Sequence, residues 1–228
     1  MQDSIEEFLS SLQTNRASEN TIRAYRADLM QFTKSRPDSN ILQKETLELD
    51  AKVWLNNNRT TWGPKTTTRK ISALRSFAKH LGWGDFIADY HAPKPARPQP
   101  HPIPEGINGV FEMIEACVGR PQQMALVSLT GLCGLRVGEA IAVRPEHFDI
   151  KEMTLDINGK GERHRVIPVS GSAWLYIAPA YYIALGRQMD QRLVQLKDRA
   201  ARGTLTRLGA NAGLSRSVAS HDMRATFG

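Results

Sequence analysis

Residues 130–140 read Thr-Gly-Leu-Cys-Gly-Leu-Arg-Val-Gly-Glu-Ala, and this stretch carries the most informative pattern in the chain. Arg136 and Glu139 are three residues apart, as are His221 and Arg224 near the end. On a helix this spacing places the two members of a pair on one face. A guanidinium presents parallel N–H donors that match phosphate oxygens, and it keeps its charge when water is excluded. Two arginines and a histidine from distant segments would therefore form a site suited to a phosphate.

The charge distribution favours a polyanionic partner. The 228 residues carry a formal net charge of +7, and 41% of them are hydrophobic. Six basic residues and no acidic ones fall between Arg59 and Lys79, and seven basic residues against two acidic ones fall between Arg187 and Arg216. Such runs are often only solvated helix faces. Two of them around a candidate phosphate site make DNA or RNA the better interpretation.

Other features disfavour export, membrane insertion and a disulfide scaffold. No apolar run approaches the roughly 18 residues that span a bilayer. The N-terminus is acidic and lacks the apolar core of a signal peptide, so we expect a cytoplasmic protein. The two cysteines, Cys117 and Cys133, lie among apolar residues, which predicts buried thiols in a reducing compartment.

The first 92 residues predict a small helical bundle, because apolar side chains recur at helical spacing and no strand pattern appears. The predicted helices are Ser4 to Leu12, Ile22 to Phe32 after the cap-type Ser18, Leu47 to Asn56, and one from Thr66 to Leu81. In the third we expect Leu49, Val53 and Trp54 to be buried. Residues 93–104 contain six prolines, which predicts an extended spacer between two domains.

The second half predicts helices and one β-hairpin. Helices are expected at Ile107 to Cys117, Gln122 to Leu132, Val137 to about Pro145, Leu175 to Leu185 and Arg187 to Ala201, with short segments onward to His221. Met153 to Ile157 alternates with period two, and Arg165 to Val169 would be the returning strand. Asn158-Gly159 favours a turn between them, which places Lys160 and Arg163 at or near the hairpin tip.

Three separated motifs together resemble those of the tyrosine recombinases, also called phage integrases. They are the stretch 130–140, Gly159-Lys160-Gly161 followed by Arg165 to Val169, and His221-Asp-Met-Arg224. Residues 18–25 and 67–75 resemble the SAM-like core-binding domain that precedes the family's catalytic domain. The resemblance implies a mainly α fold with a small β-sheet. It further implies a helical core-binding domain at 1–92, a basic proline-rich linker at 93–104 and an α+β catalytic domain at 105–228.

The resemblance also implies site-specific recombination, in which a tyrosine hydroxyl attacks DNA and forms a 3′-phosphotyrosyl link. Arg136 and Arg224 would hold the non-bridging phosphate oxygens, and Lys160 would protonate the leaving 5′ oxygen. His221 would hydrogen-bond the phosphate or help to move protons. Glu139 would orient Arg136 or the histidine. No metal or other cofactor is implied.

The implied partner is double-stranded DNA carrying core sites, bound by a homotetramer of the intact protein. The residues expected to contact DNA are Arg23, Lys65, Thr66, Arg69, Lys70, Arg75, Lys94, Arg97 and Arg163. The family's tyrosine lies beyond the His-x-x-Arg motif, and no tyrosine follows Arg224 in this sequence. We therefore expect a truncated, monomeric fragment that binds DNA without cleaving it. We expect no separate arm-binding domain before the core-binding pattern.

Two other functions fit the same motifs. A non-catalytic, recombinase-like regulator would occupy DNA sites without cutting them, and a type IB topoisomerase would share the phosphoryl-transfer chemistry. Each motif also has an ordinary structural interpretation. Arg136 and Glu139 could form a simple helix ion pair, Lys160 could be a turn residue, and His221 and Arg224 could lie on a solvated helix face.

Overall fold

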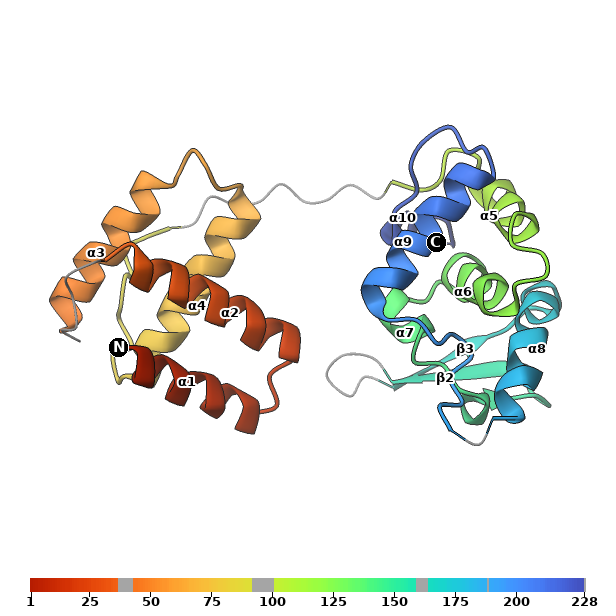
Figure 1. The fold of residues 1–228 in the computed structure, drawn as a ribbon, viewed down its shortest axis with the longest axis horizontal. Helices are drawn as coiled ribbons and strands as arrows, with labels where there is room; N and C mark the ends of the chain where they lie inside the picture. Colours follow the sequence, from red (N-terminus) through yellow and green to blue (C-terminus); the bar gives the residue numbers. More distant parts are fainter. Residues whose placement is uncertain (37–42, 92–100, 159–163, 188, 228) are drawn as a thin grey trace. The chain divides into compact units, whose positions relative to one another are not determined.

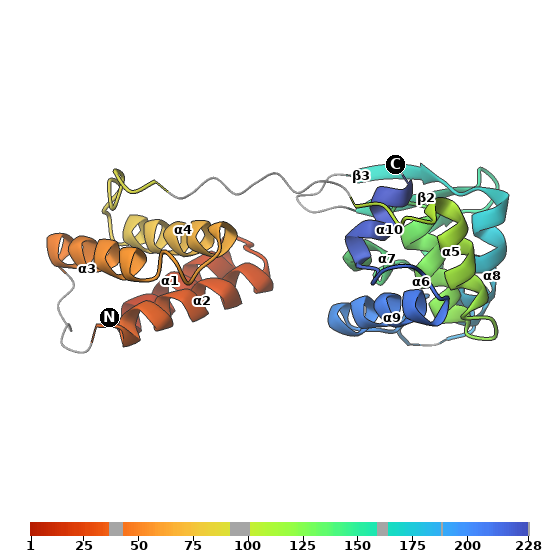
Figure 2. The same cartoon turned by 90° about the horizontal axis from the view of Figure 1, so that it is seen from above.

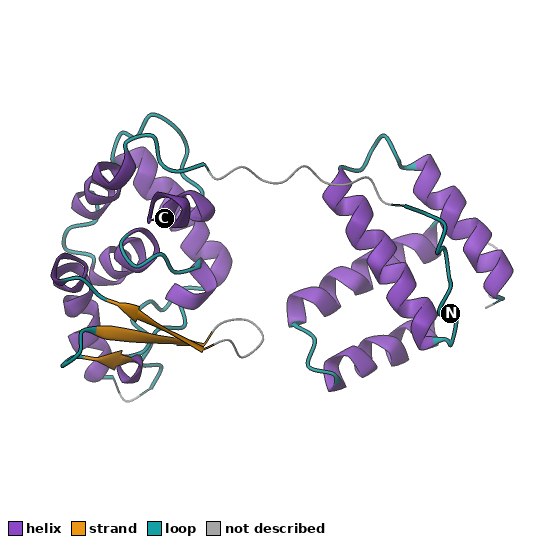
Figure 3. Cartoon of the chain, turned by 180° about the vertical axis from the view of Figure 1, so that it is seen from behind, coloured by secondary structure: helices purple, strands orange, loops and turns teal. Residues whose placement is uncertain are grey.

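A computed structural model describes residues 1–36, 43–91, 101–158, 164–187 and 189–227. The chain divides into two compact units, Met1–Arg97 and Pro98–Gly228, with the division inside the proline-rich segment. We call them unit 1 and unit 2 and describe each by itself (Figure 1). The described residues are mostly helical, and the three strands among them all belong to unit 2, as Figure 3 shows. None of the helices in the described ranges is both long and apolar enough to cross a membrane.

Unit 1 is a helical bundle, as the sequence predicted. Its helices are α1 (Gln2–Thr14), α2 (Glu19–Lys34), α3 (Lys44–Asn57) and α4 (Pro64–His80). The Ser18 side chain caps α2 by accepting a hydrogen bond from the Thr21 backbone N–H. Proline supplies the first residue of α4, where its missing N–H costs nothing. Aromatic rings from different helices meet in the core, including Phe8 with Phe77 at a centroid distance of 5.6 Å.

The buried face of α3 differs from the predicted one. Leu49 and Val53 are 64% and 48% exposed, although we expected both to be buried. The residues that α3 buries are Leu47, Ala51, Trp54 and Leu55. Apolar residues occupy two overlapping stripes of this helix, and the stripe containing the small Ala51 allows the closer approach to the core. Only Trp54 was placed correctly.

Unit 2 surrounds the apolar helix α6. Its helices are α5 (Gly106–Glu115), α6 (Pro121–Gly131), α7 (Val137–Ala140), the 3₁₀ turn η1 (Pro145–His147), α8 (Gly171–Leu185), α9 (Asp198–Asn211) and α10 (Ser220–Phe227). Residues 125–131 of α6 are all buried. In Figure 2 the sheet and α9 lie on opposite sides of the unit, with α6 and α10 between them. This arrangement places α7 and α10, which carry the predicted site residues Glu139, His221 and Arg224, against α6.

The strands form a three-stranded antiparallel sheet. They are β1 (Phe148–Asp149), β2 (Thr154–Asn158) and β3 (His164–Pro168), in the order β1-β2-β3. The predicted hairpin is present, with Asn158 opposite His164 and Ile157 opposite Arg165. Leu155 and Ile157 are buried on the inner face, so Arg165 shares that face with them. The connecting residues, including Lys160 and Arg163, lie outside the described residues.

The predicted helix from Arg187 to Ala201 is wrong. Between Arg187 and Lys197 the described residues are not helical, and α9 begins only at Asp198. The segment makes tertiary hydrogen bonds in place of helical ones: the Leu193 N–H donates to the Val143 carbonyl at 3.0 Å. Leu193 is fully buried, so this segment is held by its burial and its tertiary hydrogen bond and not by a helix. The stretch before His221, which we expected to hold only short segments, contains the 14-residue helix α9.

Candidate active site

Two glycines in residues 130–140 bring Arg136 next to α10. A Cβ on Gly131 would lie 2.6 Å from Val110 Cγ1 and 2.9 Å from Met223 Cε, so only glycine allows α6 to approach α5 and α10 this closely. Gly134 has a φ of +65°, which favours glycine, and the Phe227 ring of α10 lies directly against it. The tight turn between α6 and α7 therefore depends on both glycines.

Arg136 does not lie inside a helix, as its spacing from Glu139 suggested, but forms the N-cap of the short helix α7. The Glu139 carboxylate reaches back and accepts the Arg136 backbone N–H at 2.8 Å through Oε2. Its other oxygen, Oε1, accepts a hydrogen bond from Arg136 Nη1 at 2.9 Å. Glu139 thus fixes both the backbone and the side chain of Arg136.

Glu139 is the centre of a cluster of three arginines, which we call the arginine cluster: Arg136, Arg165 and Arg224. Arg165 donates from Nη2 to Glu139 Oε2 at 2.7 Å and from Nη1 to Oε1 at 3.3 Å. Arg224 Nη1 lies 3.8 Å from Glu139 Oε2, beyond hydrogen-bond distance. Three positive charges therefore surround one carboxylate, and the excess positive charge can bind an anion.

The electrostatics of the cluster follow from this imbalance. Burial opposes ionisation of Glu139, but hydrogen bonds from the Arg136 backbone, Arg165 and the Arg136 side chain outweigh it and lower the pKa of Glu139. Burial and the neighbouring charges of Arg136 and Arg165 lower the pKa of Arg224. Arg224 Nη1 is buried and has no hydrogen-bond partner among the described residues. A buried donor of this kind is costly unless an acceptor binds it.

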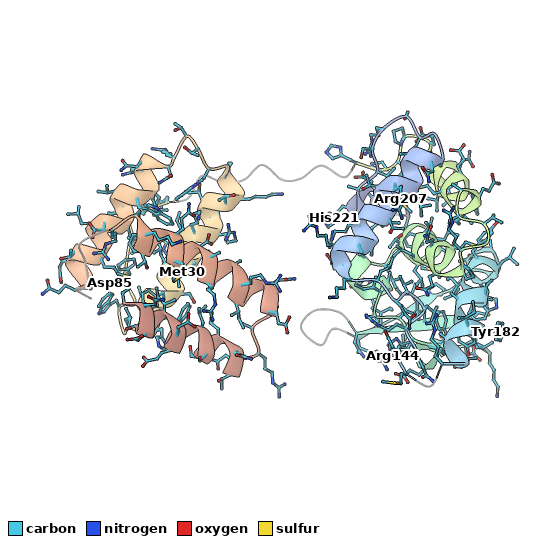
Figure 4. The ribbon with its side chains drawn as sticks, viewed as in Figure 1. Met30, Asp85, Arg144, Tyr182, Arg207 and His221 are labelled. Carbon is cyan, nitrogen blue, oxygen red and sulfur yellow. The ribbon has the colours of Figure 1, made fainter. Side chains whose placement is uncertain are left out.

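His221 and Arg224 lie one turn apart on α10. His221 is exposed, and Figure 4 shows it on the outer side of α10. Asp222 between them is buried, and its carboxylate accepts from the Ala219 N–H at 2.8 Å and from Arg216 Nη1 at 2.7 Å. These bonds fix the first turn of α10, and thereby the direction in which His221 points.

The segment entering unit 2 is attached to the same helix. Arg216 Nη2 donates to the carbonyl oxygens of His101 at 2.8 Å and Pro102 at 2.9 Å. The Ile103 N–H donates to Thr226 Oγ1 at 2.8 Å. Residues 101–103 therefore lie against both the beginning and the end of α10.

Comparison with known sequences agrees with this geometry. The profile "Phage integrase, N-terminal SAM-like domain" matches residues 5–83, and the profile "Phage integrase family" matches residues 110–228. The chain belongs to the phage integrase family. The resemblance read from the three motifs is confirmed, as is the mainly α fold class with its small sheet.

Individual relatives support the same assignment, and solved structures share the fold. The phage integrase chain is 29% identical over 255 residues to tyrosine recombinase XerC of Methylobacterium nodulans, covering 96% of the chain and 77% of the relative. It is 30% identical over 189 residues to XerC of Roseiflexus sp., covering 76% and 59%. Its fold is similar to lambda integrase residues 75–356 bound to DNA, with a TM-score of 0.69, 15% identity and coverage of 98% and 83%. It is also similar to XerH bound to difH, with a TM-score of 0.66, 17% identity and coverage of 90% and 68%.

In this phage integrase chain, Lys70 is not positioned to contact DNA as we expected. Its side chain is 4% exposed, and its Nζ lies 2.9 Å from Asp28 Oδ1 and hydrogen-bonds Gln31. The ammonium also lies 4.5 Å from the centre of the Trp62 ring. Lys70 is a buried structural residue, and its helical phase with Leu74 could have shown this.

The other predicted DNA contacts of unit 1 fall into two groups. Arg23 and Lys65 are exposed, and Thr66 is half-buried. Arg69 forms an ion pair with Asp28, and Arg75 Nη2 donates to the carbonyl oxygens of residues 87 and 90 at 2.9 and 2.8 Å. The internal contacts of Arg69 and Arg75 make them weaker candidates than Arg23 and Lys65. Lys94 and Arg97 lie outside the described residues, as does Arg163 in unit 2.

The tyrosines of α8 are held by aromatic contacts away from the arginine cluster. Tyr176 meets Phe111, and the ring centres of Tyr181 and Trp174 are 5.1 Å apart. Tyr182 is exposed, and Figure 4 places it and His221 at opposite edges of unit 2. Within the described part of unit 2, no tyrosine contact reaches the cluster.

Arg165 is the residue at the site whose role the sequence did not reveal. The sequence pattern predicts it as the start of the returning strand, yet its guanidinium is committed to Glu139. Alternation along β3 places Arg165 and Ile167 on one face, and that signal was available in the sequence. The partner, Glu139, could not be deduced from it, because the two residues come from different motifs.

Proposed function

We propose that this chain is the DNA-binding and phosphate-holding part of a site-specific tyrosine recombinase. The observation that carries the proposal is the arginine cluster: three guanidinium groups surround one carboxylate, and Arg224 Nη1 is buried with no acceptor in the part of the chain that the structure describes. A scissile phosphate has the charge and the oxygen geometry to satisfy it. The DNA-bound solved structures of similar fold support the same partner.

The proposed chemistry is attack of a tyrosine hydroxyl on the phosphorus, forming a 3′-phosphotyrosyl bond and releasing a 5′-hydroxyl. Arg136 and Arg224 hold the non-bridging oxygens and stabilise the negative charge of the transition state. Lys160 protonates the leaving oxygen, and exposed His221 hydrogen-bonds the phosphate or moves a proton. Glu139 acts on Arg136 and does not itself meet the phosphate.

We propose that residues 1–228 bind core-site DNA as a monomer without forming the covalent link. Tyr176 and Tyr181 of α8 are engaged in aromatic packing, and the exposed Tyr182 lies at the opposite edge of unit 2 from His221 (Figure 4), so we expect none of them to attack a phosphate at the cluster. Cleavage and assembly into a homotetramer would belong to the intact recombinase, whose core-binding domain is 1–92 and whose catalytic domain includes 105–228.

DNA affinity in this proposal is largely electrostatic. Arg23, Lys65 and Thr66 of unit 1 contact the duplex, with Lys94 and Arg97 of the linker and Arg163 of the hairpin contributing phosphate contacts. Such contacts release counterions, so affinity falls steeply with salt. Specificity then comes from groove contacts and from DNA deformability.

The test is selection of duplex sites from a random library by the purified chain, followed by affinity measurement across a salt series. We expect one enriched core sequence, and we expect Arg136→Ala with Arg224→Ala to weaken binding to it. A nicked suicide substrate built on that sequence should give no covalent adduct. A covalent adduct would show that the chain contains a nucleophile and would refute the proposal that it binds without cleaving. A library without enrichment would refute the recombinase assignment. If a longer form that contains a tyrosine after Arg224 also bound without cleaving, the regulator would be the better interpretation.

A further inference from the structure

Arg165 holds Glu139 by both ends of its guanidinium. Its Nη2 and Nη1 reach Glu139 Oε2 and Oε1 at 2.7 and 3.3 Å, and Arg136 supplies the other two donors from its backbone and Nη1. Each carboxylate oxygen therefore accepts two hydrogen bonds. With its donors directed at Glu139, Arg165 is not arranged as a phosphate ligand, and its effect on the site must pass through that carboxylate.

Arg136 needs such support because it is poorly enclosed. Its side chain is 59% exposed, whereas that of Glu139 is 9% exposed. An exposed arginine samples many rotamers unless a partner restricts it. Glu139 is that partner, and Arg165 prevents the carboxylate from rotating away. We infer that Arg165 is a positioning residue of the recombinase site, which fixes the phosphate-binding guanidinium of Arg136 by orienting Glu139.

The position of Arg165 in the sheet gives this contact a second effect. Arg165 begins the inner face of β3 opposite Ile157, and it lies five residues after Lys160. The hydrogen bonds between Arg165 and Glu139 therefore join β3 to α7. Arg165 thus fixes the start of β3 relative to Arg136 and α7.

The Arg165→Lys variant distinguishes a positioning role of Arg165 from an effect of its positive charge alone. It keeps the positive charge that Arg224 experiences, but it cannot make the two-ended contact with a carboxylate. A role in positioning requires Arg165→Lys to behave like Arg165→Ala. A role in charge alone requires it to behave like the wild type. The matched control is Arg192→Ala, which removes a similar two-ended contact, with Asp190, from a loop outside the cluster.

The first measurement needs no DNA. The ¹⁵Nε relaxation of the Arg136 side chain is compared in the wild type, Arg165→Ala, Arg165→Lys and Arg192→Ala, with amide exchange in α6 confirming that each chain is folded. We expect a restricted Arg136 side chain in the wild type and in the control, and a mobile one in both variants at position 165. Unchanged Arg136 mobility in folded Arg165→Ala would overturn the inference. Should Arg165→Ala fail to fold, Arg165→Lys decides the question alone.

The second measurement connects the inference to the proposed function, on which it rests. Each phosphate of the selected core site is replaced in turn by an uncharged methylphosphonate. In the wild type we expect one position with a penalty of about tenfold, the size of one charged hydrogen bond. Both variants at position 165 should reduce that peak, because Arg224 alone then holds the phosphate firmly, and should keep the smaller penalties elsewhere. A peak of unchanged height contradicts the inference alone, whereas failure to select any site contradicts the proposed function and leaves the relaxation result to decide the role of Arg165.

Discussion

Lys70 Nζ lies 2.9 Å from Asp28 Oδ1, and both side chains are buried in unit 1. The ammonium also lies 5.0 and 4.5 Å from the ring centres of Trp54 and Trp62. A residue from the most basic run of the sequence is thus part of the core. Its charge stabilises the contact between α2 and α4 and is not available to DNA.

Removing Lys70 should therefore reduce stability. We expect Lys70→Ala to lower the free energy of unfolding by about 3 kcal/mol, the lower end for a broken buried pair, because Arg69 still pairs with Asp28. Urea unfolding followed by tryptophan fluorescence measures this directly. The exposed Lys65→Ala is the control and should change stability by less than about 0.5 kcal/mol. Equal stability of the two variants would show that the buried pair contributes little.

Gly134→Ala should destabilise unit 2 for two separable reasons. The positive φ costs about 1–2 kcal/mol for a residue with a Cβ, and the clash with the Phe227 ring adds a further penalty. In a Phe227→Ala background the clash is absent, so Gly134→Ala should cost only the backbone term. A double-mutant cycle by urea unfolding measures the difference. Strict additivity would mean that the ring moves aside without cost.

The pH dependence of stability should report Glu139. Its pKa is lowered in the folded state from an unfolded value near 4.5, so the folded protein binds this proton less readily. The contribution of Glu139 is complete above about pH 4.5 and is lost as the pH falls through its folded pKa. The difference in unfolding free energy between wild type and Glu139→Gln should be constant from pH 7 to pH 5 and shrink below pH 4.5. A difference that stayed constant down to pH 3 would contradict this assignment.

Both cysteines should resist thiol reagents in the folded protein. Burial raises the pKa of Cys133 to about 12 and that of Cys117 to about 11, so neither is a thiolate at pH 8. We expect almost no reaction with Ellman's reagent under native conditions and rapid reaction of both thiols in guanidinium chloride. Fast labelling of the native protein would show that unit 2 opens readily.

The sequence was sufficient to predict the buried face of a helix when its apolar residues lie on one face only. In α4 only one stripe, containing Ile71, Leu74 and Phe77, can face the core, and the structure buries all three. In α3 two stripes compete, and the choice depends on how closely other helices approach Ala51. That approach is a tertiary property, so Leu49 and Val53 were wrongly expected in the core.

The sequence predicted which residues belong to the site better than it predicted the contacts that these residues make. Motif spacing drew attention to Arg136, Glu139 and Arg224, and the structure brings these three together. The roles assigned to them remain predictions. Arg216 could not have been found, because its acceptors include main-chain carbonyl oxygens of residues 101 and 102, which have no side-chain signature. Likewise, the segment around Leu193 was predicted to be helical. The backbone hydrogen bond from Leu193 to Val143, which replaces the helix, has no signature in the sequence.

The attachment of residues 101–103 to α10 has a mechanical consequence. Arg216 joins His101 to Asp222 at the start of the helix, and Thr226 holds Ile103 near its end. A pull on the chain at His101 is therefore transmitted first to α10, at two points on either side of Arg224. The helix that carries His221 and Arg224 therefore anchors residues 101–103, and any displacement of this segment must break the hydrogen bonds of Arg216 and Thr226.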